Sequence, residues 1–186
     1  ITPNPATLKF IPESKVLESG TMEFSSKEEA MDSDLARSIF ENDAVKNVFF
    51  GEDFITVTKD SKFEWDILKP DILSKIMTFF SSNSTIINNT SHSKNIDLEE
   101  KTNYSDSEKQ IVEQIKTLLE EKIKPAVAQD GGDISFVKFH NNIVYLILRG
   151  SCAGCPSSQI TLKSGIENML KYYIPEISAV EAVNDT

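Results

Sequence analysis

A polar, aperiodic segment at residues 83–106 most strongly constrains the fold of this 186-residue chain. Ser, Asn and Thr dominate the segment, aliphatic residues are sparse, and no hydrophobic period runs through it. A segment of this composition buries too little apolar surface to form a core and is typical of a flexible linker. We therefore predict two small α+β domains, residues 1–82 and residues 107–186, joined by a flexible linker at residues 83–106.

Residues 1–82 combine short β-branched and aromatic runs with stretches of helical spacing. Strands are predicted at residues 7–11, 22–24, 45–50 and 54–58, the last two forming a hairpin. One helix is predicted at residues 34–40. A second is predicted to begin near Pro70, because proline suits the first helical turn. Trp65, just before that helix, is expected to pack in the core.

Residues 107–186 predict the element order α-β-β-α-β, with helices packed on one sheet. Asp106 or Ser107 is expected to cap a first helix whose apolar stripe runs from Ile111 to Ile123. A turn is predicted at residues 130–133. The second helix follows the cysteines.

Three strands are predicted in this second domain, at residues 134–139, 143–148 and 177–183. The first two form a hairpin, because asparagines in the link tolerate the positive φ that a tight hairpin demands. The strand at residues 143–148 is apolar on both faces. That pattern indicates an interior position in the sheet or an outer face used for contact.

Both cysteines of the chain, Cys152 and Cys155, lie in one loop between a predicted strand and a predicted helix. A helix N-terminus carries partial positive charge and unpaired N–H groups, which favour the thiolate that soft metal centres bind. Two cysteines supply only two of the four ligands that tetrahedral zinc or a [4Fe–4S] cluster needs. Both histidines are remote in sequence, so we expect a second copy of the chain or a borrowed partner to complete the site.

Composition excludes several other classes of protein. Two cysteines three positions apart are a poor disulfide framework, which favours a reducing compartment and metal binding or redox work. The net charge of −10 argues against nucleic-acid binding. No apolar run is long enough to predict a membrane span. The chain opens with Ile1 rather than Met, so we expect further residues, which could include a transit peptide, to precede it.

Five segments of the sequence carry a resemblance to a known family. In the second domain, Asp130-Gly131-Gly132-Asp133, residues 150–158 and residues 161–167 closely resemble the C-terminal domain of NifU-type proteins. In the first domain, residues 2–10 and residues 48–59 resemble the N-terminal domain of the Nfu family.

This resemblance implies an iron–sulfur cluster carrier or scaffold rather than an enzyme. It implies that Cys152 and Cys155 of two subunits bridge a [4Fe–4S] cluster, which then passes to apo-proteins. The expected partners are a second copy in the cluster-loaded homodimer, upstream cluster-assembly proteins as donors and apo iron–sulfur proteins as recipients. The expected setting is the bacterial cytoplasm or the mitochondrial matrix.

Other interpretations of the cysteine pair stay open. A thiol–disulfide oxidoreductase would use Cys152 as its nucleophile, although the chain lacks a β-α-β unit before the motif and a proline follows Cys155. A zinc ion bridging two chains would use the same ligands and leave the protein colourless. A pair of cysteines without function is the remaining alternative.

Overall fold

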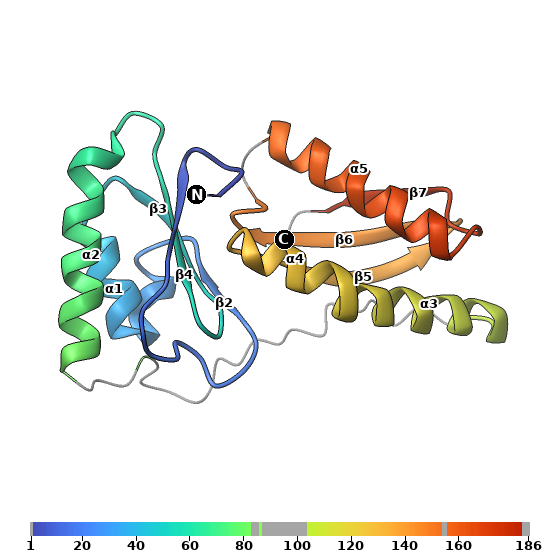
Figure 1. Ribbon diagram of the computed structural model, residues 1–186, viewed down its shortest axis with the longest axis horizontal. Helices are drawn as coiled ribbons and strands as arrows, with labels where there is room; N and C mark the ends of the chain where they lie inside the picture. The colour runs from blue at the N-terminus through green and yellow to red at the C-terminus, as the bar shows by residue number, and fades with distance from the viewer. Residues whose placement is uncertain (1, 83–85, 87–103, 154–155, 184–186) are drawn as a thin grey trace. The chain divides into compact units, whose positions relative to one another are not determined.

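The computed structural model describes residues 2–82, 86, 104–153 and 156–183, and of residues 156–158 only the backbone. The chain divides into two compact units, residues 1–96 and residues 97–186. Each unit contains a β-sheet and helices, so the predicted class of two α+β domains is confirmed (Figure 1). Most of the predicted linker lies outside the described residues, and its flexibility stays a prediction. No helix among the described residues is long and apolar enough to cross a membrane.

The first domain is built on a four-stranded antiparallel sheet in the order β1-β4-β3-β2. Its strands are β1 (Thr7–Phe10), β2 (Met22–Phe24), β3 (Val45–Phe50) and β4 (Ile55–Lys59). Each lies within one residue of its predicted bounds. Phe50 pairs with Ile55, which confirms the predicted hairpin between β3 and β4.

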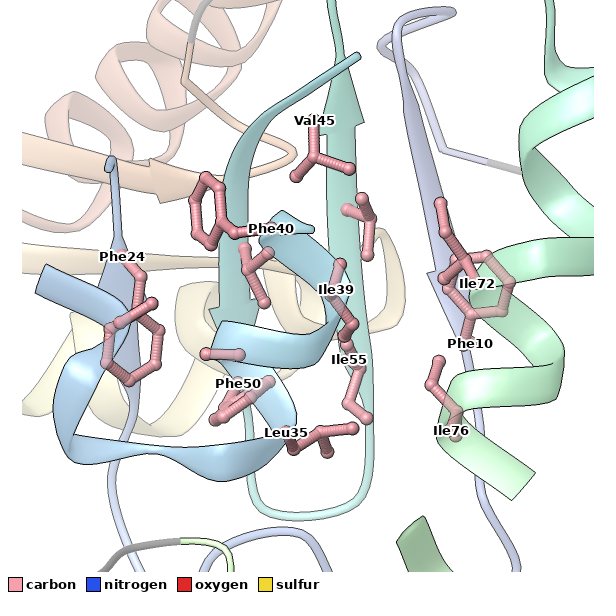
Figure 2. Packing of buried hydrophobic residues seen from close by; sticks show 14 of the residues in the cluster. Phe10, Phe24, Leu35, Ile39, Phe40, Val45, Phe50, Ile55, Ile72 and Ile76 are labelled. Atoms are coloured by element: carbon pink, nitrogen blue, oxygen red, sulfur yellow. The ribbon is translucent and has the colours of Figure 1, made fainter. Parts of the chain in front are cut away.

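A 3-10 turn, η1 (Glu29–Asp32), and two helices, α1 (Asp34–Phe40) and α2 (Trp65–Ser81), accompany this sheet. Ser33 caps α1 by accepting the N–H of Ala36 on its Oγ at 3.3 Å. The two helices and the sheet share one hydrophobic core, shown in Figure 2. Its labelled members include Phe10, Phe24, Phe50 and Ile55 from the strands, Leu35, Ile39 and Phe40 from α1, and Ile72 and Ile76 from α2.

The start of α2 differs from the prediction, because the helix begins at Trp65 rather than near Pro70. Pro70 lies inside the helix, where its missing N–H leaves the carbonyl of Asp66 without a helical partner at a cost of roughly 3 kcal/mol. Burial of Leu68 and the partial burial of Trp65 offset this cost. The Trp65 Nε1–H also donates to the carbonyl of Pro5 at 3.0 Å, so Trp65 packs on the core as predicted.

The second domain has the predicted order α-β-β-α-β, with its first helix in three pieces. These are α3 (Asp106–Leu118), a π-helical segment η3 (Leu119–Ile123) and α4 (Lys124–Gln129). The other elements are β5 (Gly132–His140), β6 (Ile143–Gly150), α5 (Pro156–Tyr173) and β7 (Ala179–Ala182). Pro125 explains the interruption, because its ring would clash with the carbonyl of Glu121 in a regular helix and the wider π turn relieves that clash.

The sheet of this domain runs in the order β5-β6-β7, with β6 antiparallel to β5 and parallel to β7. β6 is therefore the middle strand, which is the first of the two positions that its apolar faces indicated. Asn141 and Asn142 have φ of 50° and 62°, which confirms the predicted tight hairpin between β5 and β6. Buried side chains from the helices and the strands form one core.

The first helix of this domain begins with a different cap from the one predicted. Its N-cap is Ser105 rather than Asp106 or Ser107, and Ser105 and Glu108 form a reciprocal capping box. The Tyr104 hydroxyl accepts the N–H of Phe139 at 3.0 Å. Packing of the second domain thus begins before the predicted boundary at residue 107.

Candidate metal centre

The cysteine loop begins at the end of β6, a strand that pairs with β5 as far as Gly150 and with β7 as far as Leu146. Gly150, the last residue of β6, has φ of 62°, a conformation that glycine adopts without strain. The chain then turns tightly, with Cys152 N–H donating to the carbonyl of Arg149 at 3.3 Å and Ala153 N–H to that of Gly150 at 3.1 Å. These turns place Cys152 at the edge of the domain core.

The turn that precedes β5 supports this loop from the other side. Ser151 is buried, its Oγ donates to the carbonyl of Asp130 at 2.6 Å, and its N–H donates to the carbonyl of Gly131 at 3.1 Å. Gly131 has φ of 84°, which again favours glycine. The predicted turn at residues 130–133 is shorter than expected, because β5 already starts at Gly132, where it pairs with Gly150.

Gly132 lies directly against the first cysteine. A Cβ atom built on Gly132 would lie 2.3 Å from Cys152 Sγ and 2.8 Å from the carbonyl oxygen of Arg149. No side chain fits there unless the cysteine moves. Sequence reasoning assigned the paired glycines only to a turn and missed this contact.

The Cys152 thiol is buried, with 6% of the residue exposed. Burial raises the pKa of Cys152 from its ordinary 9.0 to about 12. A hydrogen bond with Ser151 lowers this pKa, while the charges of Asp130 and Asp133 raise it further. The expectation that the loop favours a thiolate is therefore wrong for Cys152 in this conformation, because desolvation outweighs the other influences.

The second predicted ligand, Cys155, lies outside the described residues together with Gly154. Its position relative to Cys152 stays a prediction. The helix after the loop begins at Pro156, as predicted, so the cysteine pair directly precedes the N-terminus of α5.

Asp130 and Asp133 are the other ligand-type side chains near this loop, close enough for their charges to raise the pKa of Cys152. His140 lies at the opposite end of β5 from Gly132, roughly 26 Å away at about 3.3 Å per residue. Among the described residues, no group of three or more His, Cys, Asp or Glu side chains lies together. If both predicted cysteines serve as ligands, their two thiols suit a soft centre such as an iron–sulfur cluster or zinc rather than magnesium or calcium.

Comparisons with known proteins match both domains. The family model described as "Scaffold protein Nfu/NifU N terminal" matches residues 1–83, and the model described as "NifU-like domain" matches residues 115–181. This chain belongs to the Nfu family. The resemblance that the sequence motifs suggested is thereby confirmed, as is the order of the two domains.

Two curated Nfu relatives cover nearly the whole chain. The human "NFU1 iron-sulfur cluster scaffold homolog, mitochondrial" is 48% identical over 99% of this chain and 70% of its own length. "NifU-like protein 4, mitochondrial" of Arabidopsis thaliana is 46% identical over 97% of this chain, which spans 63% of that relative. Among solved structures, a NifU-like protein from Saccharomyces cerevisiae matches with a TM-score of 0.43 and 28% identity over 46% of this chain and 78% of its own.

Proposed function

We propose that this protein is an iron–sulfur cluster carrier or scaffold, not an enzyme, and that two copies hold a [4Fe–4S] cluster through Cys152 and Cys155. The observation that carries the proposal is a two-cysteine ligand set in the strand-to-helix loop of a chain that belongs to the Nfu family. The human and Arabidopsis relatives described above are named a scaffold and a NifU-like protein, which supports the same role. The cluster is cargo, to be received from assembly proteins and passed to apo iron–sulfur proteins.

The number of ligands argues for two copies. A cubane cluster takes four thiolates, and the chain contains two cysteines. A twofold axis through the cluster would bring the same two cysteines from each copy, since a twofold interface repeats every contact. A cluster held between two chains is released when the chains separate, which suits delivery.

The burial of Cys152 supports easy release. Binding requires the thiol to turn out of the core and ionise, and coordination to iron compensates for the lost proton. Once the cluster leaves, the thiol can return to its contact with Gly132 as a neutral group. The free energy of that return lowers the net affinity for the cluster and favours transfer.

The oxidoreductase alternative requires the same ionisation of Cys152 as cluster binding does, so the test that separates the two is disulfide exchange by the metal-free protein. A cysteine that attacks a disulfide must be a thiolate. The pKa of Cys152, raised to about 12, opposes that ionisation in both cases. A zinc-bridged dimer would use the same ligands as the cluster carrier. The reconstitution experiment described below distinguishes the two.

We place this activity in the mitochondrial matrix rather than in the bacterial cytoplasm. The two curated relatives described above both carry the word mitochondrial in their names. A cluster-loaded homodimer, cluster donors and apo-protein recipients are the partners that this role requires.

Anaerobic reconstitution of the purified chain with iron and sulfide tests the proposal. We expect broad absorption at about 400 nm, about four irons for each two chains, and a shift from monomer to dimer in sedimentation. Cys152→Ser and Cys155→Ser should each abolish cluster binding while the far-ultraviolet circular dichroism stays unchanged. Colourless protein that retains only zinc, or a loaded monomer, would overturn the proposal.

A further inference from the structure

The outer side of α5, the helix that follows the cysteine loop, carries no charge. Every exposed α5 residue whose side chain the structure describes is uncharged. Six of them form one continuous face, named here the uncharged α5 face: Thr161, Ser164, Gly165, Asn168, Met169 and Tyr172. The charged residues of α5 lie to the side, partly buried and in ion pairs, where Lys163 contacts Glu181 and Lys171 contacts Glu167.

This face differs from the usual surface of a helix packed on a domain core, which is rich in charge. In the same domain, the exposed side of α3 carries Asp106, Lys109 and Glu113. The whole chain has 29 acidic and 19 basic residues. In this charge-rich chain, the uncharged α5 face instead exposes large side chains: Tyr172 is 80% exposed and Met169 is 37% exposed. Such side chains are typical of protein–protein interfaces.

Gly165 lies near the middle of this face, where glycine lowers helix stability relative to alanine. A Cβ atom at Gly165 would meet nothing within 4 Å, so the packing of its own domain does not require a glycine. The missing side chain, next to the small Ser164, leaves room for another backbone to approach closely.

We propose that the uncharged α5 face packs against the same face of a second copy, with the two α5 helices parallel about a twofold axis. This inference rests on the proposed function, because the shared cluster requires a second copy. Charge supports the choice of surface, since two chains that each carry a net charge of −10 repel each other wherever their carboxylates meet. The uncharged α5 face is a surface on which this repulsion is small.

The direction of the helices follows from the position of the cysteine loop. α5 begins at Pro156, directly after Cys155, so parallel helices place both loops at the same end of the pair. An antiparallel pair crossing at Gly165 would separate the two loops by roughly 27 Å, at about 1.5 Å per residue. Four thiolates could not then share one cluster. The parallel pair also directs two helix N-termini, with their partial positive charge, towards the anionic cluster.

Sedimentation of the reconstituted protein tests the contact. Gly165→Glu should weaken dimerisation of the cluster-loaded protein at least tenfold, because it brings two carboxylates together across the twofold axis. The thermal midpoint before reconstitution should not fall, because the position is exposed and glutamate favours helix. The control is Gln114→Glu on the exposed side of α3, which adds the same charge to the same domain and should change the association less than twofold.

Photocrosslinking tests the direction. Benzoylphenylalanine in place of Tyr172 should crosslink the loaded dimer to the C-terminal half of the partner's α5. A crosslink to the N-terminal half of that helix would overturn the parallel arrangement. If Gly165→Glu dimerised as tightly as the wild type, the proposed contact between the α5 helices would be wrong, and the proposed carrier function would be unaffected. If the wild-type chain binds no cluster or stays monomeric when loaded, the proposed function fails and this inference fails with it.

Discussion

Gly132 leaves room for the Cys152 thiol in the core: a Cβ atom on the glycine would lie only 2.3 Å from the cysteine Sγ. The contact joins the first residue of β5 to the loop that follows β6, and it explains why the thiol of a predicted cluster ligand is buried. In this conformation the thiol of the proposed ligand is thus kept away from solvent.

Gly132→Ala should expose Cys152 and destabilise the second domain. The new methyl group displaces the thiol and also meets the Arg149 carbonyl, and overpacking of this kind costs about 1–3 kcal/mol. We expect faster alkylation of Cys152 by iodoacetamide, followed by mass spectrometry, and a lower urea midpoint. Gly165→Ala is the matched control, because its methyl group meets nothing within 4 Å and should stabilise the fold by about 0.5–1 kcal/mol. Equal labelling rates in Gly132→Ala and the wild type would show that Gly132 does not bury the thiol.

The raised pKa of Cys152 should make the stability of the second domain depend on alkaline pH. The folded protein holds this proton up to a pKa of about 12, whereas the ordinary pKa of the thiol is 9.0. The unfolded chain therefore binds fewer protons between these values, and stability falls as the pH rises through that interval. We expect the thermal midpoint of the wild type to fall more steeply between pH 9 and pH 11 than that of Cys152→Ala. Parallel curves for the two proteins would contradict the raised pKa, since other titrating groups are common to both.

Ser151→Ala should loosen the support of the cysteine loop. The buried Oγ donates to the Asp130 carbonyl at 2.6 Å, and its loss leaves that carbonyl without this donor at a cost of about 1–2 kcal/mol. The free energy of unfolding from urea titration measures the effect. Ser178→Ala is the comparison, because the exposed Ser178 Oγ donates to the Asn142 carbonyl at 2.9 Å and its loss should cost less than about 0.5 kcal/mol. A smaller loss in Ser151→Ala than in Ser178→Ala would refute the supporting role.

Tyr104→Phe should destabilise the second domain by about 1 kcal/mol, because the N–H of Phe139 then loses the hydroxyl that accepts its hydrogen bond at 3.0 Å. Tyr172→Phe, at an exposed position, should have no measurable effect. Urea unfolding of both variants checks this expectation. Unchanged stability in Tyr104→Phe would mean that the domain does not depend on residues before its first helix.

Local signals account for the elements that sequence reasoning placed correctly. The four strands of the first domain follow from short runs of β-branched and aromatic residues, and the β5–β6 hairpin follows from asparagines that tolerate positive φ. The start of α2 was missed because it depends on a distant contact. Trp65 begins the helix with its indole bonded to Pro5, 60 residues away in the chain.

The pairing register of β5 and β6 could not be predicted from the local sequence either. His140 pairs with Ile143 across the hairpin, and a regular ladder from that pair would set Gly132 opposite Ser151. An irregularity between Phe136 and Lys138 shifts the register by one residue and sets Gly132 opposite Gly150 instead. The close contact with Cys152 arises on this shifted register.

The sequence by itself determined that this chain has two α+β domains, belongs with NifU-type proteins, and carries two soft ligands where a cluster needs four. These conclusions rest on composition, motif spacing and a count of residues, which do not depend on how the chain packs. Only the tertiary structure decided that Cys152 is buried against Gly132 with a raised pKa, and that α5 has an uncharged outer face. Burial and exposure depend on strand register and on which side of a helix meets the core, and both are set by contacts between residues far apart in the chain.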